Sequence, residues 1–121
     1  MTKQNKKTNP GLVTLIGALT AQTRSNGAAL WRDVAQRLEK SRSNWAEPNL
    51  SRLSRYAADE KTILVPGKLL GSGDVEGKHT VAAYSVSSSA REKIEAAGGE
   101  IVTIHDLMKM NPDGKGVFIL G

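Results

Sequence analysis

Through residues 61–121, short apolar runs of strand length alternate with the signals that begin helices. Ser89 and Glu92 form a capping box, in which two side chains satisfy free N–H groups of the first helical turn. Thr103 and Asp106 repeat that pattern. The apolar runs are 62–65, 80–86, 101–103 and 117–120. This alternation predicts an α/β fold, a small mixed strand–helix unit with some parallel strand pairing.

The first sixty residues predict helices instead. Pro10 suits a first helical position, where its missing N–H costs nothing, and leucine and isoleucine residues follow at helical spacing. The turn Ser25–Gly27 is expected to end that helix, and a second helix is expected over 28–40. Residues 50–56 fit either a short helix or an extended lead-in.

We expect one domain over residues 10–121, because 121 residues is a single-domain length. It would comprise a basic helical part (10–60) and an α/β part (61–121), preceded by a basic flexible tail (1–9). The order of lysines and then apolar residues near the start resembles a signal peptide, but Thr and Gly interrupt the apolar run. No stretch of 18 apolar residues occurs, so no membrane span is expected.

Positive charge is unevenly distributed along the chain. Residues 1–60 contain ten Lys/Arg and five Asp/Glu, whereas residues 61–121 contain seven of each. The whole excess of +5 therefore lies in the first half. An excess on one part of a chain indicates a polyanion bound there, since a charge serving solubility alone would be spread evenly.

The basic residues of the first half are the strongest candidates for that contact. Between Arg24 and Arg55, Asp33, Glu39 and Glu47 offset less than half of the positive charge, and arginine, which suits phosphates and stacks on bases, predominates. Trp45 and Tyr56 either stack on bases or pack within protein. No base-reading motif is visible, so recognition of backbone and shape is expected. The candidate RNA-binding residues are Lys3, Lys6, Lys7, Arg24, Arg32, Arg37, Lys40, Arg42, Trp45, Arg52, Arg55, Lys68 and Lys78.

Other chemistries have little support in the sequence. The chain has no cysteine, and His79 and His105 lack the spacing of metal ligands. The serines at 87–89 suit helix capping and do not form a Gly-x-Ser-x-Gly nucleophile motif. Glu92 and Glu95 suit a solvated helix face better than an acid–base pair. We therefore expect no enzyme, no cofactor, no metal and no small-molecule substrate.

The glycine-rich stretch after residue 70 leaves one alternative open, a small nucleotide-binding enzyme using the Gly71–Gly77 loop. A phosphate-binding loop has four residues between its first glycine and its Gly-Lys pair, whereas here there are five. His79 also stands where serine or threonine should bind magnesium.

The main prediction for this stretch is a tight turn after a strand that Pro66-Gly67 ends. The other interpretation of this stretch is that its backbone N–H groups, with Lys68 or Lys78, contact an RNA phosphate.

Three stretches together resemble a known family. They are Asn49–Tyr56, the run Ile63–Gly73 with its Pro-Gly-Lys-x-Leu-Gly-x-Gly pattern, and Ser87–Gly99, followed by a last strand near residue 120. They are similar to the archaeal and eukaryotic large-subunit ribosomal protein eighteen ("eighteen-e"), a family related to bacterial large-subunit protein fifteen. The resemblance covers nearly the whole chain, and its length suits the short archaeal form.

The resemblance implies an α/β fold of the fifteen/eighteen-e type and a structural role in translation. It implies binding to large-subunit ribosomal RNA beside neighbouring ribosomal proteins, in the cytoplasmic ribosome, without catalysis, a membrane or a homo-oligomer. Family function would fall on Lys3, Lys6, Lys7, Arg42, Arg52, Arg55 and Lys68. The tail is short for such a role, and deep penetration into RNA is not expected from it.

Overall fold

The computed structural model describes residues 10–26 and 29–121, and the side chains of residues 10, 26 and 42 are not part of that description. The predicted tail, with Lys3, Lys6 and Lys7, lies outside the described residues. The elements are α1 (Pro10–Asn26), α2 (Ala29–Glu39), the short 3₁₀ helix η2 (Arg42–Asn44), α3 (Leu50–Tyr56), β1 (Thr62–Leu69), β2 (Thr80–Val86), α4 (Ser88–Ala96), β3 (Glu100–Val102), α5 (Ile104–Met110) and β4 (Val117–Ile119).

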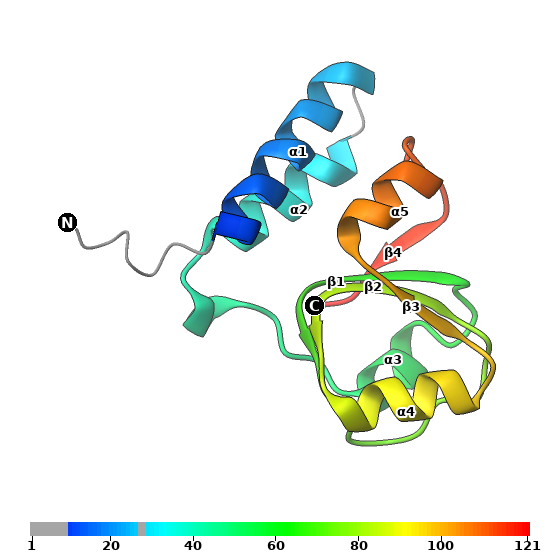
Figure 1. Cartoon of the computed structure of the whole chain (residues 1–121). Helices are drawn as coiled ribbons and strands as arrows, with labels where there is room; N and C mark the ends of the chain where they lie inside the picture. Colours follow the sequence, from blue (N-terminus) through cyan, green and yellow to red (C-terminus); the bar gives the residue numbers. More distant parts are fainter. Residues whose placement is uncertain (1–9, 27–28) are drawn as a thin grey trace.

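The four strands form one sheet in the order β3-β2-β1-β4, and every neighbouring pair is parallel (Figure 1). The chain passes from β2 to β3 through α4 and returns from β3 to β4 through α5. These two crossovers run in opposite directions across the sheet. Right-handed connections therefore place α4 and α5 on opposite faces. The predicted α/β class and parallel pairing are confirmed.

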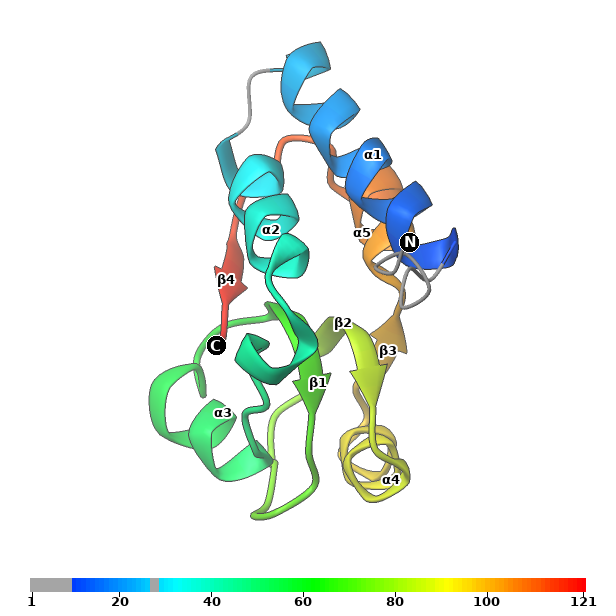
Figure 2. The ribbon, with the colours of Figure 1, turned by 90° about the vertical axis from the view of Figure 1, so that its left-hand side faces the viewer.

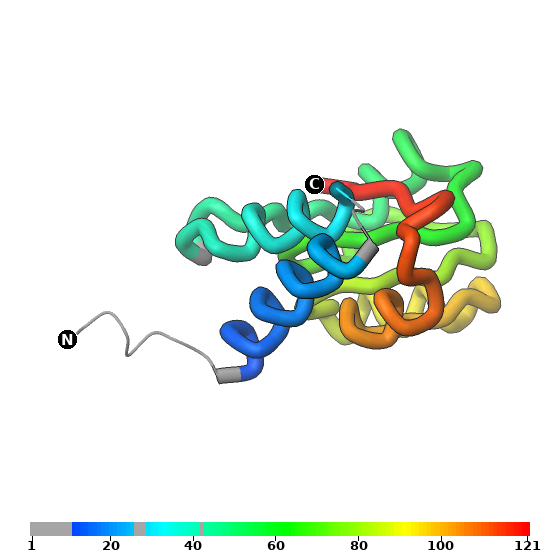
Figure 3. Tube along the Cα trace, turned by 90° about the horizontal axis from the view of Figure 1, so that it is seen from above, coloured from blue at the N-terminus to red at the C-terminus, as the bar shows by residue number. Residues whose placement is uncertain are grey.

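Each face of the sheet has its own core, because side chains alternate along a strand. On β1, Leu64 packs with α1, α2 and α5, whereas Ile63 and Val65 pack with α3 and α4. Figure 2 shows α1, α2 and α5 on one side of the sheet and α3 and α4 on the other. Seen from above in Figure 3, α1 and α2 lie side by side.

Trp31 ties the helical hairpin to the rest of the fold. Its side chain is completely buried, and its indole N–H donates to the carbonyl of Pro112 at 2.7 Å. Because an indole buried without a partner would lose a hydrogen bond to water, this contact makes the burial favourable. It connects α2 with the loop that follows α5.

The strand β1 is longer than the sequence predicts. Pro66-Gly67 does not end it, so that prediction is wrong, and the strand continues to Leu69. The pairing register with β2 shifts between Val65 and Lys68. Such a bulge accommodates a proline, which has no N–H to give to the ladder.

The starts of the helices agree with the sequence at α5 but differ from it at α4. The hydroxyl of Ser87 caps α4 by accepting from a backbone N–H three residues ahead at 3.2 Å, so the predicted capping box at Ser89 and Glu92 is wrong by two residues. Thr103 caps α5 as predicted. Residues 50–56 form a helix rather than an extended lead-in. Within the described part of the chain, no helix is long and apolar enough to cross a membrane.

Candidate nucleic-acid interface

The helix α3 turns its charged side outwards because its apolar side is completely buried. Leu50 and Leu53 pack into the core that α3 shares with α4. The helical repeat then places Arg52 and Arg55 on the outer surface, where both are exposed. Tyr56, at the end of the helix, is 56% exposed.

Backbone hydrogen bonds fasten the segment before α3 to the second half of β1. The N–H of Lys68 donates to the Ala46 carbonyl at 3.0 Å, and the N–H of Leu70 donates to the Pro48 carbonyl at 2.8 Å. In return, the N–H of Leu50 donates to the Leu70 carbonyl at 3.1 Å. These bonds extend strand pairing up to the first residue of α3 and hold the helix in one position.

Asn49 completes this attachment. Its side-chain oxygen accepts a hydrogen bond from the N–H of Ser72 at 3.1 Å, and the N–H of Ser51 donates to the Ser72 carbonyl at 2.9 Å. The hydroxyl of Ser54 then donates to the carbonyl of Asp74 at 2.5 Å. The loop after β1 therefore lies along α3 as part of the fold.

Two glycines allow the close approach that these bonds require. A Cβ at Gly67 would overlap the carbonyl oxygen of Ala46, and a Cβ at Gly71 would overlap the hydroxyl of Ser89. The Gly71 Cβ would also lie 2.8 Å from the backbone nitrogen of Ala90, far inside van der Waals contact. The Pro-Gly-Lys-x-Leu-Gly pattern thus serves the packing of this loop against α4 and the segment before α3.

Lys93 of α4 holds the same loop from the other side. Its ammonium group donates to the Gly71 carbonyl at 2.9 Å and to the Gly73 carbonyl at 2.7 Å. In a phosphate-binding loop, by contrast, backbone N–H groups converge on the ligand. Here Lys93 donates to two loop carbonyls, and the side-chain oxygen of Asn49 accepts a hydrogen bond from one N–H group of the loop. The alternative of a nucleotide-binding enzyme has no support in this arrangement.

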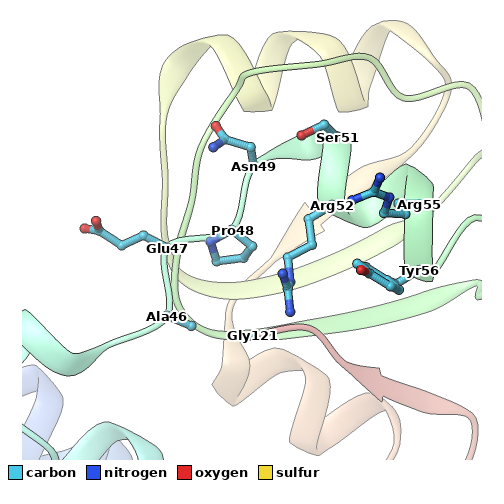
Figure 4. Close-up of a pocket in the computed structure, with 9 residues that line it drawn as sticks. All are labelled: Ala46, Glu47, Pro48, Asn49, Ser51, Arg52, Arg55, Tyr56 and Gly121. Carbon is cyan, nitrogen blue, oxygen red and sulfur yellow. The ribbon is translucent and has the colours of Figure 1, made fainter.

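A hollow of about 830 Å³ lies between α3 and the segment before it (Figure 4). In it, the guanidinium carbons of Arg52 and Arg55 lie 5.2 Å and 5.8 Å from the centre of the Tyr56 ring, within the range of cation–π contacts. Glu47 also lines the hollow, but its side chain points away from these three. The lining residues are Ala46, Glu47, Pro48, Asn49, Ser51, Arg52, Arg55, Tyr56 and Gly121.

The two arginines of α3 have no carboxylate partner among the described residues. Among the side chains that the structure describes, which do not include that of Arg42, the only ion pairs join Arg37 to Asp33 at 3.0 Å and Arg91 to Glu95 at 3.8 Å. The guanidinium groups of Arg52 and Arg55 therefore remain available to an anion from outside the chain.

A smaller hollow, also lined by basic side chains, lies next to the one beside α3 at the edge of the sheet. It has a volume of about 230 Å³, and Arg37, Lys40 and Trp45 line it. Ala46 and Gly121 line both this hollow and the larger one. Lys40, at the end of α2, and Arg37, whose charge Asp33 offsets, thus lie next to the hollow of α3.

On its other side, α3 borders an acidic region. A hollow of about 730 Å³ shares Ser51 and Arg55 with the first one and is also lined by Asp74 and Glu76. These carboxylates would repel phosphates, so the basic surface ends at Arg55.

Arg24 and Arg32 form a separate basic group on α1 and α2. Both are exposed and line a hollow of about 330 Å³, together with Glu39 and the hydroxyls of Thr20 and Thr23. Because α1 and α2 cover one face of the sheet and α3 the other, this group is separate from Arg52 and Arg55. The basic residues of the first half therefore do not form one patch.

Comparison with known proteins identifies the family of this chain. The model of the family described as "Ribosomal protein 60S L18 and 50S L18e" matches residues 1–121. The chain belongs to this family. It is 48% identical over 120 residues to "Large ribosomal subunit protein eL18" of Methanospirillum hungatei, which covers 99% of each chain. It is 51% identical over 114 residues to the protein of the same name from Halobacterium salinarum, covering 94% of this chain and 97% of the other.

A third relative of the same name, from Methanothermobacter thermautotrophicus, is 43% identical over 120 residues and 99% of each chain is covered. All three are archaeal, and the short archaeal form of the family is what the length predicts. The predicted resemblance is therefore confirmed, and so is the expectation that this member of the L18e family is not an enzyme.

The remaining residues of the predicted set have varied positions in this L18e-family fold. Lys68 precedes the glycine-rich loop in the sequence and Lys78 follows it, and both side chains are exposed. Trp45 packs edge-on against Tyr84, with ring centres 5.0 Å apart, and its N–H donates to the Lys40 carbonyl at 2.9 Å. This arrangement favours the packing role for Trp45. The side chain of Arg42, like the three tail lysines, lies outside the described residues.

Proposed function

We propose that this chain is a structural constituent of the large ribosomal subunit, acting in translation in the cytoplasmic ribosome and catalysing nothing. Its partners would be large-subunit ribosomal RNA and neighbouring large-subunit proteins, with one copy of the chain in each subunit and no homo-oligomer. Membership of a ribosomal protein family supports this role.

The α3 surface is our proposed principal contact with RNA. The observation that supports it most directly is the pair Arg52 and Arg55, which are exposed and stand on a helix fastened to the sheet. Neither has a carboxylate partner within the part of the chain that the structure describes. Because the backbone that carries both arginines is already held in place, binding phosphate does not require that segment to be ordered first.

The other predicted residues would widen this contact. Arg37 and Lys40 lie where the basic surface continues, and Arg24 and Arg32 would bind a second RNA segment across the sheet. Six further residues stay in the proposed set only because they are positively charged: Lys3, Lys6, Lys7, Arg42, Lys68 and Lys78. Trp45 stays in it as a side chain that supports the hollow beside Lys40.

Sedimentation tests the role in the subunit. A tagged chain in a cell lysate should comigrate with large ribosomal subunits on a sucrose gradient, and ribonuclease treatment should abolish that comigration. A chain that remains at the top of the gradient in untreated lysate would contradict the proposal.

Binding to purified large-subunit RNA tests the surface. The double variant Arg52→Gln/Arg55→Gln should bind more weakly and lower the slope of log affinity against log salt by about 1 for each phosphate that the variant no longer binds. Arg91→Gln, on α4 and already paired with Glu95, is the matched control and should change neither quantity appreciably. Equal effects from both changes would argue against α3.

A further inference from the structure

Resting on the proposed function, we propose that the 830 Å³ hollow beside α3 receives one unpaired nucleotide of ribosomal RNA. Its base would stack against the side chains of Arg52 and Tyr56, and its phosphate would lie beside a guanidinium group of α3. The hollow thereby recognises a local feature of RNA shape, an extruded base, in addition to the phosphate backbone.

The size of the hollow fits such an occupant. Sites for small ligands span about 300–1,000 Å³, and this one lies within that range. Base-paired RNA keeps its bases stacked on one another, so only an unpaired nucleotide can bring the face of a base into a hollow. Proteins commonly bind such bases between aromatic side chains and arginine planes.

The exposure of Tyr56 is the observation that points to a base rather than to phosphate alone. The ring is 56% exposed, although large apolar side chains usually contribute to a core. It is placed by Arg52, one turn earlier on the same helix, and by Arg55. A phosphate would need only the arginines, whereas the ring adds a stacking surface that every base can use.

The rest of the hollow suits the edge and sugar of a nucleotide. Pro48 gives a buried apolar wall, and Ser51 offers a hydroxyl. The oxygen of the Asn49 amide is already bound to the N–H of Ser72, so its amino group is the part left to donate to a ligand. The arginines and the Asn49 amino group therefore offer hydrogen-bond donors, which suit the carbonyl oxygens and ring nitrogens of bases.

The hollow between α1 and α2 provides an internal comparison. It also holds two arginines, Arg24 and Arg32, but has less than half the volume, includes Glu39 and is lined by no aromatic residue of the described ranges. Phosphate contact is all that its chemistry supports. The two hollows should therefore differ in what they protect when RNA binds.

Nucleotide-resolution acylation of the 2′-hydroxyls of large-subunit ribosomal RNA tests the inference. The wild-type chain should suppress the reactivity of one or two unpaired nucleotides that are reactive in free RNA. With Tyr56→Leu, those nucleotides should regain the reactivity of free RNA, affinity should fall on the order of tenfold, and all other protections should persist. Tyr56→Phe should retain both the protection and the affinity.

The possible failures have different meanings. If the wild-type chain binds RNA but Tyr56→Leu leaves every protection intact, the nucleotide site is wrong and the proposed function stands. If the wild-type chain does not bind large-subunit RNA, the proposed function fails first. Circular dichroism of both variants should match the wild-type spectrum, because the Tyr56 ring is exposed and outside the buried core.

Discussion

At the scale of single residues, the position of the loop after β1 depends on the missing side chain of Gly71 and on the ammonium group of Lys93. Gly71 has no side chain where the Ser89 hydroxyl lies, and Lys93 supplies its ammonium group to two loop carbonyls. Both features hold the loop against α4, and hydrogen bonds from Ser51 and Ser54 attach α3 to the same loop.

Gly71→Ala should destabilise the protein. The added methyl group would overlap the Ser89 hydroxyl and the Ala90 backbone nitrogen, and such overpacking costs about 1–3 kcal/mol of unfolding free energy. Urea unfolding measures this. Gly17→Ala is the matched control, since a Cβ at that position in α1 would meet no described atom within 4 Å apart from its chain neighbours and its own helix backbone. It should raise the free energy of unfolding by about 0.5–1 kcal/mol.

Lys93→Met should also lower the free energy of unfolding, by about 1–2 kcal/mol, because it removes two charge-assisted hydrogen bonds from a half-buried site. Lys109→Met, an exposed change on α5, should stay within about 0.5 kcal/mol of the wild type. Thermal unfolding of the two variants side by side distinguishes a structural lysine from a solvated one. Equal midpoints would contradict the role assigned to Lys93.

The sequence could not have predicted this role for Lys93. It lies between Glu92 and Glu95, a pattern typical of a solvated helix face, and its partners are carbonyl groups 22 and 20 residues away in sequence. Every residue has a backbone carbonyl, so the residue type does not indicate which carbonyl will accept a hydrogen bond from a lysine. The exposure of Arg52 and Arg55 was predictable, because the leucines of the same helix mark its buried side.

At the scale of the elements, helix starts show why predicted boundaries differ from observed ones. Three serines precede α4 or open it, and the motif pattern selects Ser89, whereas the geometry of the chain leaving β2 selects Ser87. The residue with extended backbone just before the helix is the one able to cap it. Sequence spacing alone does not show where the strand ends.

Ser87→Ala should cost about 1 kcal/mol of unfolding free energy, the usual value for losing an N-cap. Ser89→Ala should cost much less, because Ser89 is exposed and lies inside the helix. Guanidinium unfolding of both single variants measures the difference. A larger loss from Ser89→Ala would show that the capping box begins at Ser89 after all.

The two basic groups should contribute unequally to RNA binding. Arg52→Glu/Arg55→Glu should weaken affinity for large-subunit RNA more than Arg24→Glu/Arg32→Glu, because Glu39 already offsets the charge beside the second pair. Filter binding at several salt concentrations measures both double variants. Both should unfold at nearly the wild-type temperature, since all four arginines are exposed. A collapse in stability would instead show that the changed arginines are structural.

At the scale of the whole molecule, one sheet joins two cores. Leu38 packs on the face that α1, α2 and α5 cover, and Leu53 packs on the face of α3 and α4. Because β1 contributes residues to both cores, loss of either core should destabilise the sheet that the other needs.

Leu38→Ala and Leu53→Ala should each lower the free energy of unfolding by about 2–5 kcal/mol and leave one cooperative transition. Calorimetry, with tryptophan fluorescence as a second probe, measures this. Two separated transitions in either variant would show that the two cores unfold independently, against the prediction of a single domain.

The charge distribution predicted a basic half of the chain but not its arrangement in space. Counting residues to position 60 groups α3 with α1 and α2, whereas packing places α3 on the opposite face of the sheet. Only the fold shows that the hollow beside α3 and the hollow that Lys40 lines at the end of α2 meet at Ala46. A linear count cannot contain that information, because neighbouring elements in sequence lie on different sides of the sheet.

The partner of β1 on its outer side is β4, formed by residues 117–119. During synthesis, a nascent chain would expose the first half of that edge, residues 62–64, until residues 117–119 had been made. Pairing between distant segments is also slow, and an open edge can recruit other chains. Newly made copies should therefore depend on a chaperone, or on rapid delivery to their assembly site, to avoid aggregating in the interval.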